Sequence, residues 1–510
     1  MHHARKTIGL LGGFFASTLL VHCVSSQDGG PAAGTPFVPG VPDAAPAPQG
    51  DAGTTLDATV PVDAAPPDDA AVADAAANDG APSGRLDPTF GGTGYVTASN
   101  VGSLDGGPPL FEYVYGGALD TSGRLLLGGV SQYQGAGGYA ALVRVTSAGA
   151  VDTTFGTAGA WAKTSTIAGT YDTAYAVTAG PSDSVLAVGQ SDNNNINEVV
   201  WKVGSGGALD TTFAGTGYTG QTGIAFAVTR DTTGNVFVGG QIQSNGGPLA
   251  VWKYTSAGAL DTTFGAPNGW ITATRTSGYD GGQPWDTVEG LQIDGSGRVL
   301  AVGQSSTDAA DDFAGVIWRF TSTGAVDTTF NTTGHLLFEH TAAGVVTLGD
   351  AVRAVVLDAQ GNIVVVGSSY TNGATPTSRA WVARVTPAGA LDATFGTAGV
   401  VTFAPIGAGG VPVLTSGFAI AIDTKGRILV AGSTGINISN PTLAVWRLDT
   451  HGALDATFGT AGAFTMTGTS GGTYDAPTGV AVDAVDRAVV FGNSTNDAGA
   501  YAWTAWRLTP

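Results

Sequence analysis

The chain has 510 residues, of which 80 are glycine and only 12% are charged, and its formal net charge is −20. This much glycine argues against a helical protein, because glycine costs about 1 kcal/mol relative to alanine inside a helix. The negative charge argues against a nucleic-acid partner, since the phosphate backbone attracts basic surfaces. Cys23 is the only cysteine, so disulfides cannot hold the rest of the chain together.

Residues 1–23 predict a signal peptide. Arg5 and Lys6 precede an apolar run, residues 7–21, that is short for a membrane span. The run leads into Leu-Val-His-Cys, which resembles a bacterial lipobox, although His22 stands where that pattern prefers a small residue. The resemblance implies diacylation of Cys23, a membrane lipid anchor and an exported lipoprotein at the outer membrane or cell surface. The alternative is ordinary signal cleavage a few residues later, which gives a secreted or periplasmic protein.

Residues 24–84 predict a disordered linker between this segment and the rest of the chain. The stretch is rich in alanine, proline and aspartate, and it contains no lysine, arginine or glutamate. Such a composition cannot bury enough apolar surface to fold, and its like charges repel one another. We expect a semi-extended tether that holds the folded domain away from the membrane.

Residues 85–510 contain one phrase seven times, at intervals of 51 to 66 residues. The phrase approximates Leu-Asp-x-Thr-Phe-Gly, and a repeat of this length indicates one supersecondary unit per copy. Short strands and tight turns follow each copy, without helical periodicity, as expected for the four strands of a propeller blade. The seven copies begin at Leu86, Val151, Leu209, Leu260, Val326, Leu391 and Leu454.

These units resemble the delta-60 repeat of bacterial secreted and surface proteins, with its LDxTFGxxG and DxxGKIxVxG phrases. The resemblance covers residues 86–510 and implies an all-β fold, a seven-bladed β-propeller with four-stranded blades. The repeats begin with an outer strand, residues 90–97, and end on a third strand at residues 506–510. We therefore expect the N-terminal strand to complete the last blade, which removes exposed sheet edges.

Each repeat carries one aspartate in its recurring phrase and one cation on its third strand. We predict a structural ion pair or turn clamp, and the alternative is a basic ring that binds a ligand. The phenylalanine of the phrase, from Phe90 to Phe458, is expected to pack between blades. The aspartates are Asp87, Asp152, Asp210, Asp261, Asp327, Asp392 and Asp455, and the cations are Arg144, Lys202, Lys253, Arg319, Arg384, Arg447 and Arg507.

An acidic residue recurs four positions before a small residue of the innermost strand in five repeats. Hard cations take several carboxylate oxygens, so one hypothesis is a calcium-like or small-ligand site where these residues ring the channel mouth. The alternative is that each carboxylate accepts backbone N–H groups and holds its strand in place. The five residues are Glu112, Asp172, Asp286, Asp350 and Asp475. Without such a cation, we expect no cofactor.

The loops opposite the conserved turns vary between repeats, and variable loops on one face of a repeat protein indicate a binding face. We therefore predict a monomeric, non-enzymatic binding or scaffold module for a protein or glycan partner. An enzyme such as a propeller lyase or hydrolase is the remaining alternative. After the leader the only histidines are His335, His340 and His451. Aromatics suited to glycan stacking are Tyr133, Tyr171, Trp270, Tyr279, Trp285, Tyr370 and Tyr474.

Overall fold

The computed structural model describes residues 83–510 except for short segments. These are residues 102–110, 134–136, 165, 168–170, 193–195, 243–246, 274–275, 278–284, 308–312, 340, 342–348, 372–376, 404–413 and 436–439. The predicted signal peptide, Cys23 and nearly all of the predicted linker lie outside the described residues. Within them, no helix is both long and apolar enough to cross a membrane.

The described residues are almost entirely β-structure, apart from one short 3-10 helix at Pro181–Asp183. The strands are β1 (Tyr95–Ala98), β2 (Phe111–Leu119), β3 (Leu125–Gln132), β4 (Gly138–Val145), β5 (Ala160–Lys163), β6 (Tyr171–Ala179), β7 (Val185–Asp192), β8 (Ile196–Val203), β9 (Tyr218–Thr222), β10 (Ile224–Arg230), β11 (Val236–Gln241), β12 (Leu249–Tyr254), β13 (Trp270–Ala273), β14 (Asp286–Ile293), β15 (Val299–Ser306), β16 (Phe313–Phe320), β17 (His335–Phe338), β18 (Gly349–Leu357), β19 (Ile363–Thr371), β20 (Thr377–Val385), β21 (Val400–Thr402), β22 (Leu414–Ile422), β23 (Ile428–Gly435), β24 (Thr442–Leu448), β25 (Ala463–Met466), β26 (Gly471–Val482), β27 (Ala488–Asn496) and β28 (Tyr501–Leu508).

In the described ranges these strands form six sheets, and neighbouring strands pair antiparallel with one exception. Four sheets take four consecutive strands each: β2–β5, β6–β9, β10–β13 and β22–β25. One larger sheet contains β14–β17 and β18–β21, and strands of its two halves pair only at Phe313 and Gly349, in parallel. The remaining sheet has the order β1-β28-β27-β26.

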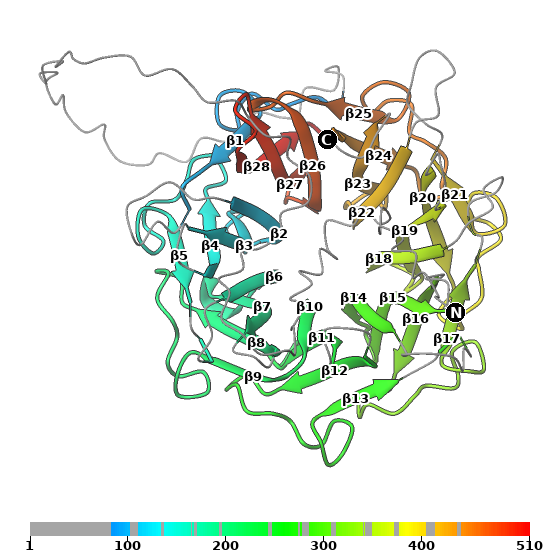
Figure 1. Ribbon diagram of the computed structural model, residues 1–510. Coiled ribbons are helices and arrows are strands. Elements are labelled where there is room, and N and C mark those ends of the chain that lie inside the picture. Colours follow the sequence, from blue (N-terminus) through cyan, green and yellow to red (C-terminus); the bar gives the residue numbers. More distant parts are fainter. Residues whose placement is uncertain are drawn as a thin grey trace, which may run out of the picture. The chain divides into compact units, whose positions relative to one another are not determined.

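The N-terminal strand completes the sheet of the last three strands, as the order of the repeats predicts. Strand β1 pairs antiparallel with β28, and Tyr95 lies opposite Trp506. Figure 1 shows the sheets arranged around a central axis, with β2, β6, β10, β14, β18, β22 and β26 nearest to it. Consecutive members of this series contact each other, and β26 in turn contacts β2. The strand order thus brings the first and last repeats together.

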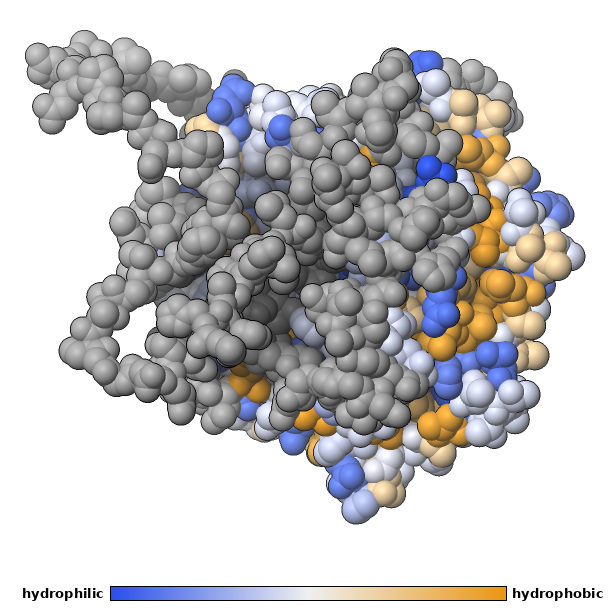
Figure 2. All heavy atoms as spheres, turned by 45° about the vertical axis from the view of Figure 1, so that its right-hand side comes forward, coloured by the Kyte–Doolittle hydropathy of each residue, from blue (hydrophilic) through white to orange (hydrophobic). Residues whose placement is uncertain are grey.

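The hydrophobic core lies between neighbouring sheets. Phe90, for example, belongs to a buried cluster with Leu125 of β3 and Trp503 of β28, which come from two sheets. The seven phenylalanines of the recurring phrase are at most 2% exposed, so the prediction that they pack between sheets is confirmed. On the surface that Figure 2 colours, hydrophobic and hydrophilic residues are interspersed. The core is therefore a ring of inter-sheet layers.

Two ends of this ring can be distinguished by their connections. The DxxG turns after the innermost strands and the recurring LDxTF phrases lie at one end, which we call the turn end. The loops that lead into the innermost strands and into the third strands lie at the other, which we call the loop end. Successive antiparallel strands alternate between the two ends, and this fixes the assignment of every connection.

Candidate functional site

The Asp–cation pairs of the turn end form in all seven repeats, as predicted from the sequence. The ion-pair distances between the cationic nitrogen and the aspartate Oδ2 run from 2.7 to 2.9 Å. In addition, the aspartate Oδ1 accepts the backbone N–H two residues later, as Asp327 does from Thr329 at 3.1 Å. Each pair therefore holds its turn against its own third strand.

The arginines of these pairs also bind the next sheet. Arg319 Nη1 donates to the carbonyl of Pro387, and Arg384 Nη1 donates to the carbonyl of Thr450 at 2.6 Å. The guanidinium of Arg319 lies 4.7 Å from the centroid of the Phe330 ring, a distance at which cation–π attraction is significant. These contacts occupy the arginines at the turn end, which favours the structural interpretation over a basic ligand-binding ring.

The aspartates of the pairs are acidic groups stabilised in their charged form. Burial alone would raise the pKa of Asp327, but the hydrogen bonds from Thr329 and the charge of Arg319 outweigh it. The pKa of Asp327 is therefore lowered. The other six aspartates of the set show the same direction. The turn end is thus expected to keep its ion pairs at any mildly acidic or neutral pH.

The five carboxylates proposed to ring the channel mouth are buried instead, between 0 and 2% exposed. Each accepts hydrogen bonds from the loop that leads into its strand. The Thr166 amide donates to Asp172 Oδ2 at 3.0 Å, and the Thr469 amide donates to Asp475 Oδ2 at 3.1 Å. The structure thus places these carboxylates inside the fold against local N–H donors, and the cation site at the channel mouth stays a prediction.

The threonines that bind these carboxylates also accept from a tryptophan. Trp201 Nε1 donates to Thr166 Oγ1 at 3.0 Å, and Trp506 Nε1 donates to Thr469 Oγ1 at 2.9 Å. Burial raises the pKa of Asp172 and of Asp475, and raises that of Glu112 to about 7, against the lowering effect of their hydrogen bonds. In the described residues, no three His, Cys, Asp or Glu side chains gather as a metal ion would require. The contacts match the alternative that the carboxylates hold the loops.

A girdle of bulged residues, which the sequence did not reveal, crosses the innermost strands. In every innermost strand the pairing register shifts by one residue at the same place, which is a β-bulge. Bulges re-aim side chains and are frequent beside functional sites. The girdle residues are Tyr115, Tyr175, Phe226, Glu289, Arg353, Phe418 and Thr478.

Part of the girdle is aromatic (Tyr115, Tyr175 and Phe226), which we call the aromatic arc, and part is an ion pair (Glu289 and Arg353). The rings of Tyr115 and Tyr175 lie 4.9 Å apart, and those of Tyr175 and Phe226 lie 5.4 Å apart, although the three residues come from three sheets. Arg353 donates to both carboxylate oxygens of Glu289 in the neighbouring repeat. Each girdle residue directly precedes the small residue that recurs in its strand. Aligning the repeats one position earlier would have found them.

The aromatic arc continues toward the loop end as a cluster of Phe111, Tyr113, Tyr474 and Tyr501. The rings of Tyr113 and Tyr115 lie 5.0 Å apart, and Tyr501 packs edge to face against Phe111, Tyr113 and Tyr474 at 5.3 to 5.8 Å. The hydroxyls of Tyr113 and Tyr474 lie 3.3 Å apart. We call these four residues the aromatic cluster. It concentrates aromatic rings where the first and last repeats meet.

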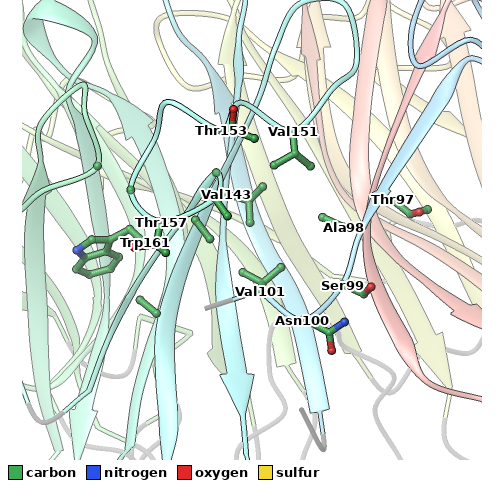
Figure 3. A pocket seen from close by; sticks show the side chains of 16 residues that line it. Thr97, Ala98, Ser99, Asn100, Val101, Val143, Val151, Thr153, Thr157 and Trp161 are labelled. Carbon is green, nitrogen blue, oxygen red and sulfur yellow. The ribbon is translucent and has the colours of Figure 1, made fainter. Parts of the chain in front are cut away.

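A groove lies on the turn-end side of the same junction, as Figure 3 shows. Its volume is about 650 Å³. Val143 and Trp161 come from β4 and β5, and Ala98 and Asn100 come from the end of β1 and the residues after it. The lining labelled in Figure 3 mixes small and aliphatic side chains with hydroxyl and amide groups and the indole of Trp161, and it includes no charged group.

Other residues singled out from the sequence are dispersed. Trp285 donates to Thr287 and packs against Phe313, while Trp270 lies on the outer strand β13 opposite Trp252. Burial lowers the pKa of His335, which lies on β17, and the His451 imidazole contacts Thr450 at 3.2 Å. Tyr133 and Tyr370 lie in or beside separate sheets, β3 and β19, whereas Tyr171 and Tyr474 adjoin the aromatic arc. Tyr279 and His340 lie outside the described residues.

Comparisons with known proteins agree with this architecture. A family model described as a domain of unknown function (DUF5122) beta-propeller matches residues 117–155, 295–330, 361–395 and 426–458. The chain is therefore built from propeller repeats. A search of curated proteins finds no match.

Solved structures are similar only distantly. A protein of unknown function from Dyadobacter fermentans is 12% identical, with 81% of this chain and 97% of that one covered and a TM-score of 0.37. An α-L-arabinanase from Penicillium chrysogenum is 11% identical, covering 80% and 97%, with a TM-score of 0.37. A subtype N11 neuraminidase-like protein of A/flat-faced bat/Peru/033/2010 (H18N11) is 10% identical, covering 82% and 93%, with a TM-score of 0.38. Similarities this remote carry no argument about activity.

Proposed function

We propose that the chain is a surface-tethered, non-enzymatic propeller that binds a glycan at its loop end. The observation that carries the proposal is the aromatic cluster of Phe111, Tyr113, Tyr474 and Tyr501 at the junction of the first and last repeats. Sugar rings present apolar C–H faces and polar edges, so they pair with aromatic faces flanked by polar groups. At the turn end, by contrast, the charged groups of the Asp–cation pairs bind one another and the neighbouring sheet.

We further propose seven blades. The eight-stranded sheet then counts as two blades, because its halves repeat the four-stranded order of the other sheets and share a single residue pair. The delta-60 likeness of the repeats supports this count. The signal peptide, the lipid on Cys23 and the disordered linker complete the proposal with an outer-membrane or cell-surface location. A monomer is the expected assembly, since the inter-sheet contacts run from each repeat to the next and from the last to the first.

A glycan array tests the proposal. The full chain should retain a restricted set of neutral glycans, and Tyr474→Ala, which removes a half-buried ring of the cluster, should lower the signal at least fivefold. Trp270→Ala is the matched control, since it removes a half-buried ring from an outer strand of another sheet. A chain that retains no glycan, or equal losses in both variants, would contradict glycan binding by this cluster.

A further inference from the structure

A second hollow at the junction, on the loop-end side, has the walls of a binding site. Its volume is about 550 Å³, within the size range of pockets that hold small ligands. Strands β1, β2 and β28 line it together with the end of β27 and the residues before β26. We call it the seam pocket. It depends on the return of β1 to the last sheet, because β1 supplies one of its walls.

Three parts of the wall are held by polar side chains, of which the carboxyls of Glu112 and Asp475 are buried. Glu112 accepts the backbone N–H groups of Asn100 at 2.9 Å and Val101 at 2.5 Å, which fixes the segment after β1. The contacts of Asp475 with the Thr469 amide fix the segment before β26. A wall that is ordered before binding spares the ligand the cost of ordering it.

The third part of the wall is the turn between β27 and β28. The Asn496 side chain accepts the backbone N–H groups of Ala498 and Ala500, each at 3.0 Å. The Ser470 hydroxyl of the segment before β26 lies 2.5 Å from that of Ser494, which ties that segment to β27. Hydrogen bonds within the protein therefore hold these three wall segments in place without a ligand.

The lining of the seam pocket combines aromatic rings, neutral polar groups and the buried carboxyl of Glu112. Phe111 and Tyr501 supply half-buried rings that pack edge to face at 5.6 Å, so the pocket adjoins the aromatic cluster. Thr97, Ser99 and Asn100 supply exposed hydroxyl and amide groups from the opposite wall. No lysine or arginine occurs among the residues that line it, all of which the structure describes.

We propose that the seam pocket binds a neutral saccharide of one or two rings, which rests on the glycan function proposed above and gives it a place and a ligand class. The aromatic rings match the C–H face of a sugar, and the hydroxyl and amide groups match its edge. Sugars that carry a carboxylate are disfavoured, because the pocket offers no cation to pair with them. The volume limits the bound portion to one or two rings.

Calorimetric titration of the full chain with cellobiose, lactose and chitobiose, and with glucuronic acid as the charged comparison, tests this assignment. At least one neutral disaccharide should bind with a Kd in the millimolar range or below, and glucuronic acid should not bind. Tyr501→Ala should weaken binding at least tenfold. Phe313→Ala is the matched control, because Phe313 begins the third strand of another repeat, as Tyr501 does, and lies away from the pocket. It should change the Kd less than twofold.

A second variant covers the case in which Tyr501→Ala fails to fold. Ser99→Trp introduces a bulky ring from an exposed position, so it should fill the pocket, abolish binding and leave the unfolding midpoint unchanged. Binding that survives Ser99→Trp would overturn the seam pocket while leaving a glycan site elsewhere at the loop end. No binding of any disaccharide to a chain that gives a positive glycan array would also overturn the pocket alone. Failure in both assays would overturn glycan binding itself.

Discussion

Replacement of Arg319 by lysine measures what the arginine adds to the Asp–cation pair. Arg319 is 2% exposed and makes three contacts: Nε with Asp327 at 2.7 Å, Nη2 with Thr329 at 3.0 Å, and Nη1 with the Pro387 carbonyl of the next sheet. Lysine keeps only the first, as Lys202 does with Asp210 at 2.9 Å. Two hydrogen bonds from a charged donor, each about 1.5–3 kcal/mol, are lost, so the free energy of unfolding should fall by about 3–6 kcal/mol.

Equilibrium denaturation in urea, followed by tryptophan fluorescence, gives the change in the free energy of unfolding for Arg319→Lys. The reverse exchange Lys202→Arg supplies the control, since an arginine there can reach the next sheet as Arg319 does. It should raise the free energy of unfolding. A value for Arg319→Lys within about 0.5 kcal/mol of the wild-type protein would refute the reasoning, because it would show that the inter-sheet bonds add nothing beyond the ion pair.

Three further outcomes are expected. Burial raises the pKa of Glu198, which the Tyr254 hydroxyl binds, from 4.5 to about 8, so the folded state favours the protonated acid. Stability should therefore decline as pH rises from about 4.5 to about 8, and thermal melts of Glu198→Gln across this range should lose that slope. Glu289→Gln leaves Arg353 without its charged partner and should cost about 3–5 kcal/mol in urea denaturation, whereas a loss under 1 kcal/mol would contradict a buried pair. Calcium should not shift the unfolding midpoint relative to a chelator, because the five buried carboxylates lie in separate repeats, and a saturable rise would restore the cation hypothesis.

The hydrogen bonds between neighbouring sheets at the turn end follow the repeat pattern even where the first and last repeats meet. In six repeats the recurring phrase binds a turn of the next sheet through one backbone bond, as the Gly396 amide does with the His451 carbonyl at 2.8 Å. The recurring phrase that begins at Leu454 makes this bond with the other end of the described residues. The Gly459 amide instead donates to the carbonyl of Ser83 at 3.0 Å, and the Gly84 amide donates to Thr509. The two ends of the folded part thus rebuild one repeated turn between them.

The sequence by itself determined the features that recur with the repeat. The number of phrases, the Asp–cation pairs, the packing of phenylalanines such as Phe330 and the pairing of β1 with β28 all follow from spacing and strand order. Most of these depend on contacts within one repeat or between successive repeats, which a repeated pattern records directly. The pairing of β1 with β28 follows from the order of the strands in the repeat.

Only the tertiary structure decided where the individual side chains meet. From the sequence, a carboxylate such as Asp172 or Glu112 that faces a channel cannot be distinguished from one that accepts a backbone N–H. The fold places both carboxylates inside, against N–H donors. The contact of Tyr115 with Tyr175 depends on a bulge in each of the two strands, and the sequence does not show where the bulged side chains point. The seam pocket joins Ser99 and Tyr501, which lie about four hundred residues apart in the chain. Contacts between such distant positions arise from ring closure, so local patterns could not predict them.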